Sequence, residues 1–121
     1  MVTELTKGNW NATVDSDGIV FVDFWAAWCG PCRRFAPIFE AVAARNPDIV
    51  FGKVDTEAER ELAGAFRITS IPTLVAIRDG IVLFAQPGAL SEAALDDLVA
   101  KVRAADMAEI RRHVTGRPAV R

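Results

Sequence analysis

The chain has 121 residues, of which 51% are hydrophobic and 25% are charged, and its formal net charge at pH 7 is −2. These values are typical of one globular domain that is large enough to fold without a disulfide framework. The slightly acidic balance argues against nucleic acid as a partner, and the lack of any run of about 18 apolar residues argues against a membrane-spanning helix.

The first third of the chain predicts a strand, a helix and a second strand. We expect a short strand over residues 2–6, a helix over 7–15 and, after a turn at Asp17-Gly18, a strand over 19–25. The last of these segments is almost continuously apolar and rich in β-branched residues. Such a run is typical of a strand that is covered on both faces of a parallel or mixed sheet.

The middle of the chain predicts helix, strand and helix. Apolar residues recur at helical spacing over residues 29–45, where Pro37 should kink the helix and Asn46-Pro47 should end it. We expect a strand over 49–55 and a short helix over 57–66, which is rich in Glu and Ala.

A hairpin and a final helix follow. Residues 72–78 and 81–86 are predicted strands, and Asp79-Gly80 between them is a strong signal for a hairpin turn. Ser91 is expected to cap the last helix. Alternating strands and helices require parallel strands with crossover helices, and the hairpin adds antiparallel strands. The expected fold class is therefore α/β, with a central mixed β-sheet of about five strands and about four helices on its two faces.

We expect the main domain to span residues 1–105. Residues 106–121 carry a net charge of +2, in contrast to −4 for the residues before them. We interpret this segment as a basic C-terminal extension that either continues the last helix or forms a flexible tail. A docking role for the extension is the alternative.

The only two cysteines, Cys29 and Cys32, are the strongest chemical signal in the sequence. A structural zinc site usually needs four Cys or His ligands, and the single histidine, His113, is remote in sequence, so we expect no metal site. Cysteines at positions i and i+3 of a helix lie about 5–6 Å apart between their β-carbons, which allows a Cys29–Cys32 disulfide. We therefore interpret them as a redox pair rather than as structural thiols.

The place of this pair, between a strand and a helix, assigns different roles to the two thiols. Cys29 lies where unpaired amides and the helix dipole stabilise a thiolate, which makes it the attacking nucleophile. Cys32 lies one turn deeper, should be less exposed, and resolves the mixed disulfide that Cys29 forms with a substrate. Gly30 permits the tight turn, and Pro31 falls in the first helical turn, where its missing N–H does no harm.

Two charged residues interrupt otherwise apolar strands. Asp23 shares a strand face with Trp25, and burial there should raise the pKa of its carboxyl. It is a candidate buried acid–base group for the proton of Cys32, although an Asp inside a strand more often makes a structural hydrogen bond or ion pair. Lys53 is the candidate partner of Asp23, and a surface lysine with a half-buried stem is the alternative.

One segment, at residues 22–32, resembles the active-site signature of the thioredoxin family: Val-Asp-Phe-Trp-Ala-Ala-Trp-Cys-Gly-Pro-Cys. Further along, Ile71-Pro72-Thr73 resembles the cis-proline loop of that family, and Gly88-Ala89-Leu90 resembles the segment before its last helix. The resemblance covers roughly residues 5–105. It implies the thioredoxin fold and a protein-disulfide reductase that maintains cell redox homeostasis through the two cysteines, with a redox-active disulfide and no bound cofactor.

The resemblance also implies roles for residues around the cysteines. Trp28 would cover the rim of the active site, and Trp25 would pack beneath the disulfide. Ile71, before a cis Pro72, would present backbone groups to an extended substrate segment, in the manner of an added strand. Gly88 would keep the substrate groove open beside the cysteines.

The chain departs from the family pattern at several positions. Phe66 stands where many relatives have an aromatic hydroxyl, and Arg67 and Ser70 replace small residues near the groove. Arg33 and Arg34 follow the motif where relatives often carry one basic and one apolar residue. We expect them to make the rim more basic and to help lower the pKa of the nucleophilic thiol. The alternative is that they are two solvated helix arginines.

We expect a monomer that acts in electron transport on disulfide-containing protein substrates. An NADPH-dependent thioredoxin reductase is the electron donor that the resemblance implies. Residues 1–11 contain no apolar stretch of the kind found in export signals, which favours a cytoplasmic reductant. Two alternatives stay open: a protein-disulfide oxidase or isomerase on the same fold, and a binding or chaperone module in which redox chemistry is incidental.

Overall fold

The computed structural model describes residues 1–114, and within them five strands form one mixed sheet in the order β1-β3-β2-β4-β5. The strands are β1 Val2–Glu4, β2 Ile19–Trp25, β3 Val50–Asp55, β4 Thr73–Arg78 and β5 Ile81–Pro87. The helices are α1 Trp10–Val14, α2 Gly30–Arg45, α3 Arg60–Ala65, α4 Glu92–Ala104 and α5 Met107–His113. The predicted α/β fold with a central mixed sheet is confirmed.

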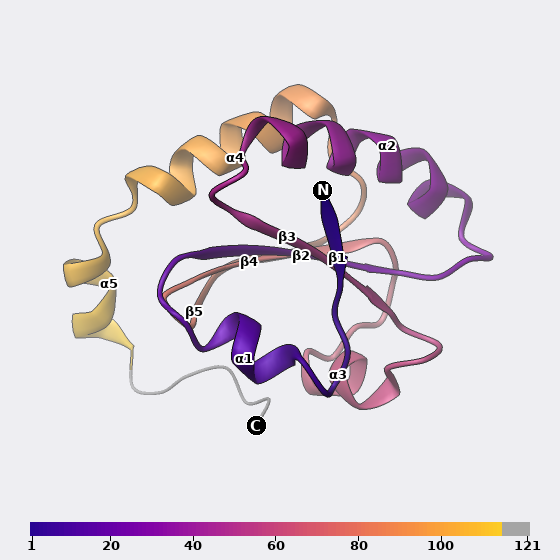
Figure 1. The fold of residues 1–121 in the computed structure, drawn as a ribbon, viewed down its shortest axis with the longest axis horizontal. Helices are drawn as coiled ribbons and strands as arrows, with labels where there is room; N and C mark the ends of the chain where they lie inside the picture. The colour runs from indigo at the N-terminus through magenta and orange to yellow at the C-terminus, as the bar shows by residue number, and fades with distance from the viewer. Residues whose placement is uncertain (115–121) are drawn as a thin grey trace.

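Helices cover both faces of the sheet (Figure 1). α2 and α4 lie on one face, where the core includes Phe21 of β2, and α1 and α3 lie on the other, where it includes Val22. Side chains along a strand alternate between its two faces, so β2 contributes to both cores. This double burial is the physical reason for the nearly continuous apolar run in β2.

The pairing of β2 places two loops at the same edge of the sheet. β2 runs parallel to β3, with Asp23 opposite Lys53, and antiparallel to β4, with Phe24 opposite Thr73. The carboxyl end of β2 therefore meets the amino end of β4. The loop that leads into α2 and the loop that precedes β4 are brought together in this way, although they are far apart in sequence.

The β4–β5 hairpin has the predicted two-residue turn. Asp79 and Gly80 have φ values of 53° and 80°, and Arg78 pairs with Ile81 across the turn. Positive φ at both central residues matches the right-handed twist of the flanking strands, and Asp-Gly is a preferred sequence for it.

The third helix is shorter than predicted. The expected helix over residues 57–66 begins only at Arg60. Asp55 Oδ1 accepts hydrogen bonds from the backbone N–H groups of Glu57 at 2.9 Å and Ala58 at 3.4 Å. This local turn competes with helix formation for the same amides, and helical periodicity does not reveal it.

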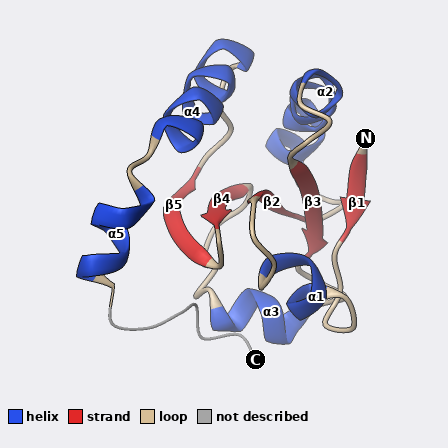
Figure 2. Cartoon of the chain, turned by 60° about the vertical axis from the view of Figure 1, so that its left-hand side comes forward, coloured by secondary structure: helices blue, strands red, loops and turns tan. Residues whose placement is uncertain are grey.

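The C-terminal residues form a separate helix instead of extending α4. Figure 2 shows α5 as a helix of its own after α4. Ala105 has extended backbone angles, φ −60° and ψ 136°, and Asp106 caps α5 by accepting a hydrogen bond from Glu109 N–H at 3.1 Å. Of the expected extension, residues 115–121 lie outside the described part of the chain. No helix in residues 1–114 is long and apolar enough to cross a membrane.

Specific contacts hold α5 against the hairpin. Met107 is buried, and Arg111 Nη2 lies 2.7 Å from Asp79 Oδ2. Arg78 Nη1 donates to the carbonyl oxygens of Val102 at 2.9 Å and Ala105 at 3.3 Å. Arg78 thus adds a charged donor to carbonyls at the end of α4, where few backbone N–H groups remain to bond them.

Candidate active site

The two cysteines occupy the amino end of α2. Cys29 is the N-cap residue, with extended backbone angles (φ −88°, ψ 112°), and Pro31 lies in the first turn. A disulfide joins Cys29 and Cys32, whose Cα atoms are 5.2 Å apart. Cys32 N–H also donates a hydrogen bond to Cys29 Sγ at 3.2 Å. The sulfur of Cys29 therefore takes the position in which an N-cap side chain satisfies an amide at a helix start.

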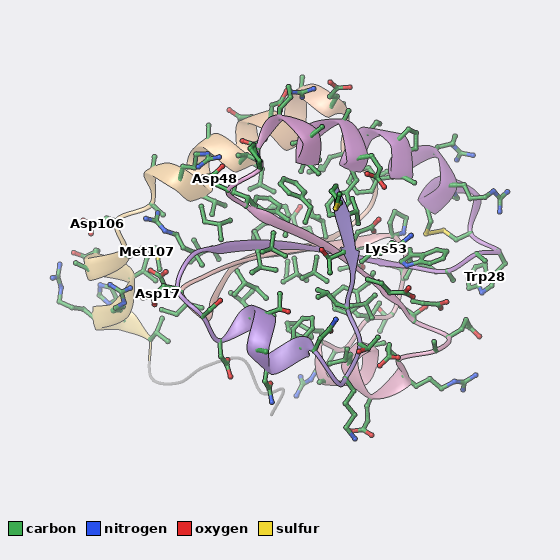
Figure 3. The ribbon with its side chains drawn as sticks, viewed as in Figure 1. Asp17, Trp28, Asp48, Lys53, Asp106 and Met107 are labelled. Carbon is green, nitrogen blue, oxygen red and sulfur yellow. A yellow bond between two sulfur atoms is a disulfide. The ribbon has the colours of Figure 1, made fainter. Side chains whose placement is uncertain are left out.

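Little of either sulfur is open to solvent, because Cys29 is 4% exposed and Cys32 is 2% exposed. The expected difference in exposure between the two thiols is thus small in this oxidised form. The exposed feature of the site is Trp28, at 68%, which lies beside the disulfide in Figure 3. Trp28 therefore presents an exposed apolar surface beside Cys29.

The loop before β4 reaches the disulfide, and the segment after β5 bonds to that loop. The Ile71–Pro72 peptide bond is cis, and the Ile71 carbonyl oxygen lies 3.7 Å from Cys29 Sγ. Gly88 N–H donates to the Pro72 carbonyl at 2.7 Å and has a φ of 106°, which favours glycine. A side chain at Gly88 would point into open space, so the surface beside Pro72 is unobstructed.

Asp23 is one of two buried polar or charged residues within residues 1–114, at 5% exposure. Its Oδ1 atom has no hydrogen-bond partner among the described residues. Burial raises the pKa of the Asp23 carboxyl from 3.8 to about 7, and the positive charge of Lys53 partly opposes this rise. The carboxyl is therefore able to take up and release a proton near neutral pH.

Lys53 lies on β3 directly opposite Asp23 but does not form an ion pair with it. Its ammonium instead lies over the ring of Trp25, with Nζ 5.1 Å from the ring centroid. Trp25 Nε1 is itself buried, without a hydrogen-bond partner among residues 1–114. Lys53 thus acts on the carboxyl through space, while its direct contact is a cation–π interaction.

A pocket of about 630 Å³ lies next to Trp28, on the side of α3. Its walls come from the β3–α3 connection and from the loop before Pro72, and include Thr56, Glu57, Arg60, Ile68, Thr69 and Ser70. Of these, only Ser70 was singled out in the sequence analysis. The sequence pattern did not identify Glu57 and Arg60 as site residues, because only the tertiary fold brings them beside Trp28.

The arginines that depart from the family pattern lie in different environments. Arg33 Nη1 donates to the Ala27 carbonyl at 2.9 Å, and a β-carbon added to Gly30 would lie 3.4 Å from Arg34 Nη1. Both guanidinium groups therefore fold back toward the turn that carries the cysteines. Arg67, by contrast, lies after α3 and has a φ of 54°.

Phe66 belongs to the core below the sheet. Its ring centroid lies 5.4 Å from that of Trp10 and 5.5 Å from that of Phe24. A phenylalanine without a hydroxyl group suits this apolar surrounding, because a buried hydroxyl would need a hydrogen-bond partner. Among residues 1–114, no group of three or more His, Cys, Asp or Glu side chains is arranged to hold a metal ion.

Comparisons with known proteins agree with this site. The sequence profile of the family described as Thioredoxin matches residues 1–101. A Streptomyces coelicolor protein named "Putative thioredoxin 2" is 57% identical over 92% of this chain and 83% of its own length. The thioredoxin of Bacillus subtilis is 40% identical over 71% of this chain and 84% of its own length. That of Listeria monocytogenes is 37% identical over 84% and 98%, respectively.

Proposed function

This chain belongs to the thioredoxin family, and on that basis we propose the part that each residue around Cys29 and Cys32 takes in catalysis. The activity is protein-disulfide reduction by thiol–disulfide exchange, and disulfide-containing proteins are the substrates. Thioredoxins carry no cofactor, so the redox-active cysteine pair is itself the active site. The observation that carries the assignment is the position of the disulfide at the amino end of α2, against the Ile71 carbonyl.

Cys29 is the nucleophile of the reduced protein. Its thiolate is stabilised by the Cys32 N–H group, which already points at Sγ, and by the positive end of the α2 dipole. The thiolate attacks one sulfur of the substrate disulfide. A bond forms between that sulfur and Cys29 Sγ, the substrate S–S bond breaks, and the other substrate sulfur leaves as a thiolate with the bonding electron pair.

Cys32 resolves the mixed disulfide, with Asp23 as the acid–base group. The Asp23 carboxylate takes the proton from the Cys32 thiol, and the resulting thiolate attacks Cys29 Sγ. The mixed disulfide breaks, and the second substrate sulfur leaves as a thiolate. Two electrons have then passed from the protein dithiol to the substrate, and Cys29 and Cys32 are joined. A carboxyl pKa of about 7 suits proton exchange at neutral pH.

The remaining site residues position the substrate and tune the cysteine pair. An extended substrate segment lies along the backbone of Ile71 and Pro72, beside the open surface at Gly88. Trp28 packs on the substrate at the rim, and Trp25 supports the disulfide from below with Lys53 over its ring. Gly30 and Pro31 set the geometry of the turn between the cysteines.

The setting of this chemistry is also part of the proposal. An NADPH-dependent thioredoxin reductase returns electrons to the Cys29–Cys32 disulfide, so the protein acts in electron transport. A cytoplasmic location suits a reductant, because thiols are kept reduced there. The active unit is a monomeric domain of residues 1–105, and residues 106–121 form a basic extension that takes no part in catalysis.

Replacing Cys32 with Ser tests the proposed roles. Without the resolving thiol, the mixed disulfide through Cys29 should persist, because no second attack breaks it. Reduced Cys32→Ser protein is mixed with a disulfide-containing protein and analysed by non-reducing electrophoresis and mass spectrometry. We expect a covalent adduct on Cys29, and none with the matched Cys29→Ser variant. If adducts form only with the Cys29→Ser variant, Cys32 is the nucleophile and Cys29 the resolving thiol, which would contradict the proposal.

A further inference from the structure

We propose that Arg33 and Arg34, at the start of α2, make the protein prefer disulfides whose neighbouring residues are acidic. The inference rests on the reductase activity described above and adds a substrate class to it. The occupant of this surface is a segment of a disulfide-containing protein that carries Asp or Glu next to the target cysteine. Three observations lead to it: the direction of the two guanidinium groups, the lack of carboxylates that neutralise them, and the character of the opposite rim.

Both guanidinium groups are directed at the turn that carries the nucleophile. Arg33 Nη1 is fixed on the Ala27 carbonyl at 2.9 Å, next to exposed Trp28. Arg34 Nη1 lies over Gly30, at 3.4 Å from the position a β-carbon would take there. Both side chains are exposed, so their charges face the solvent from which a substrate approaches.

Among residues 1–114, neither Arg33 nor Arg34 has a carboxylate within ion-pair distance. Most other lysines and arginines of the described chain do have a carboxylate close by. Six of them form ion pairs with carboxylates at 3.0 Å or closer: Lys7, Arg45, Lys101, Arg103, Arg111 and Arg112. Three other cations of the described chain also lack a carboxylate partner: Lys53 lies over Trp25, Arg78 donates to carbonyls at the end of α4, and Arg67 is exposed after α3. Arg33 and Arg34 are thus two adjacent exposed arginines without a carboxylate partner, and they lie at the active-site turn, although the whole chain has a net charge of −2.

The opposite rim of the site does not cancel this charge. Arg60 and Glu57 both line the pocket beside Trp28, and they lie 3.8 Å apart, so their charges largely offset each other. Asp55 keeps its negative charge, but its Oδ1 atom is engaged by two backbone N–H groups on the side of α3, and Asp23 is buried below the surface. A substrate that approaches Cys29 from solvent thus meets two arginines on the side of α2.

Charge complementarity follows from this arrangement. A carboxylate next to the substrate cysteine passes over Gly30 when its sulfur reaches Cys29, within the range of the two guanidinium groups. The attraction between this carboxylate and the guanidinium groups raises the rate of productive encounter and stabilises the mixed disulfide. Added salt weakens the attraction, because the Debye length falls to about 3 Å at 1 M. The net charge of the chain alone predicts the opposite preference, for basic substrates.

Three disulfide-linked peptides test the proposal. They share one sequence and differ only in the residues that flank the cysteine, which are Glu, Gln or Lys. We measure kcat/KM for their reduction by the full-length protein, with dithiothreitol to restore the dithiol. At low ionic strength we expect the Glu peptide to be reduced at least about fivefold faster than the Lys peptide, and the ratio to fall below about twofold at 1 M NaCl.

Variants locate the source of the preference. Arg34→Gln should lower the Glu/Lys ratio by about two- to fivefold, and Arg34→Lys, which keeps the charge, should largely retain it. A change in the nucleophilicity of Cys29 affects all three peptides alike and cancels in the ratio. Lys101→Gln is the matched control, because it removes one exposed positive charge from α4 and should leave the ratio unchanged.

The outcomes separate this inference from the activity on which it rests. If the Gln peptide is not reduced at all, the reductase function itself is wrong. If the Gln peptide is reduced but the Glu and Lys peptides react equally, or the Lys peptide reacts faster, only the substrate preference is wrong. A ratio that responds to Lys101→Gln as strongly as to Arg34→Gln also overturns it, since the preference would then reflect net charge.

Discussion

Asp23 shows how burial changes the chemistry of one residue. Its carboxyl has a pKa of about 7 because burial penalises the charged form, and the charge of Lys53 only partly compensates. The folded protein therefore holds a proton at Asp23 between about pH 4 and pH 7, where the unfolded chain has already released it. Over this range the contribution of Asp23 to the free energy of unfolding decreases as the pH rises.

Asp23→Asn should remove this pH dependence. Asn is nearly isosteric with the protonated carboxyl, so the two proteins should be similarly stable near pH 4. Above about pH 7 the variant should be more stable, by up to about 4 kcal/mol for a pKa rise of about three units. Urea unfolding of both proteins across this pH range measures the difference.

Two controls accompany that experiment. Asp48 also titrates abnormally, because Arg103 lowers the pKa of its carboxyl to about 2, but this effect is the same in both proteins and cancels in the difference. The kinetic control is the rate at which Cys32 resolves a mixed disulfide. If Asp23→Asn leaves the pH dependence of that rate unchanged, the proposed acid–base role of Asp23 is wrong.

The carboxyl end of α3 shows how a short element is terminated. Arg67 N–H donates to the Gly64 carbonyl at 3.0 Å, and Ile68 N–H donates to the Ala63 carbonyl at 3.0 Å. This pair of bonds is the Schellman motif, which places one residue in the left-handed region, usually glycine. Here that residue is Arg67, with a φ of 54°, so the backbone is strained at this position.

Arg67→Gly should therefore not weaken the protein. Glycine removes a steric cost of about 1–2 kcal/mol in the folded state and adds about 0.5–1 kcal/mol of backbone entropy to be lost on folding. We expect a gain of up to about 1 kcal/mol, seen as a rise in Tm of about 2–5 °C. Arg67→Ala is the control for loss of the arginine side chain. It keeps the strain and should give no such gain.

At the scale of the whole molecule, the active site and the C-terminal helix lie at opposite ends. Figure 3 shows Trp28 beside the disulfide at one end and Asp106 and Met107 at the other. α5 is tied to the β4–β5 turn by the Arg111–Asp79 ion pair, and its Met107 is buried, while Arg78 binds the Ala105 carbonyl just before α5. Its contacts thus stabilise the fold without reaching the groups that carry out disulfide exchange.

A chain that ends at Ala105 should keep the activity and lose stability. Burial of Met107 and the exposed Arg111–Asp79 ion pair together contribute about 1–3 kcal/mol, so we expect Tm to fall by about 5–15 °C. The kcat/KM for disulfide reduction at 25 °C should stay within about twofold of the full chain. A larger loss of activity in a protein that remains folded would contradict the proposed boundary at residue 105.

Several features were fixed by local sequence alone. The bounds of β2 agree with the prediction, because a strand buried on both faces has a continuous apolar run. The Asp79-Gly80 turn and the Ser91 cap also agree, because each depends on the backbone or side-chain chemistry of one or two residues. The spacing of Cys29 and Cys32 on a helix was likewise enough to allow the disulfide that the structure contains.

Other features depended on residues that are distant in sequence. Local sequence gave no measure of how deeply Asp23 is buried, which decides the pKa of its carboxyl, nor did it show that Lys53 contacts Trp25 instead. The separate helix α5 was not predicted, because local sequence left open either a continued last helix or a flexible tail, whereas the docking of α5 on Asp79 is a tertiary contact. Features that depend on neighbouring residues can be predicted from the sequence. The desolvation of a side chain and the charges around it depend on residues that only the fold brings together in space.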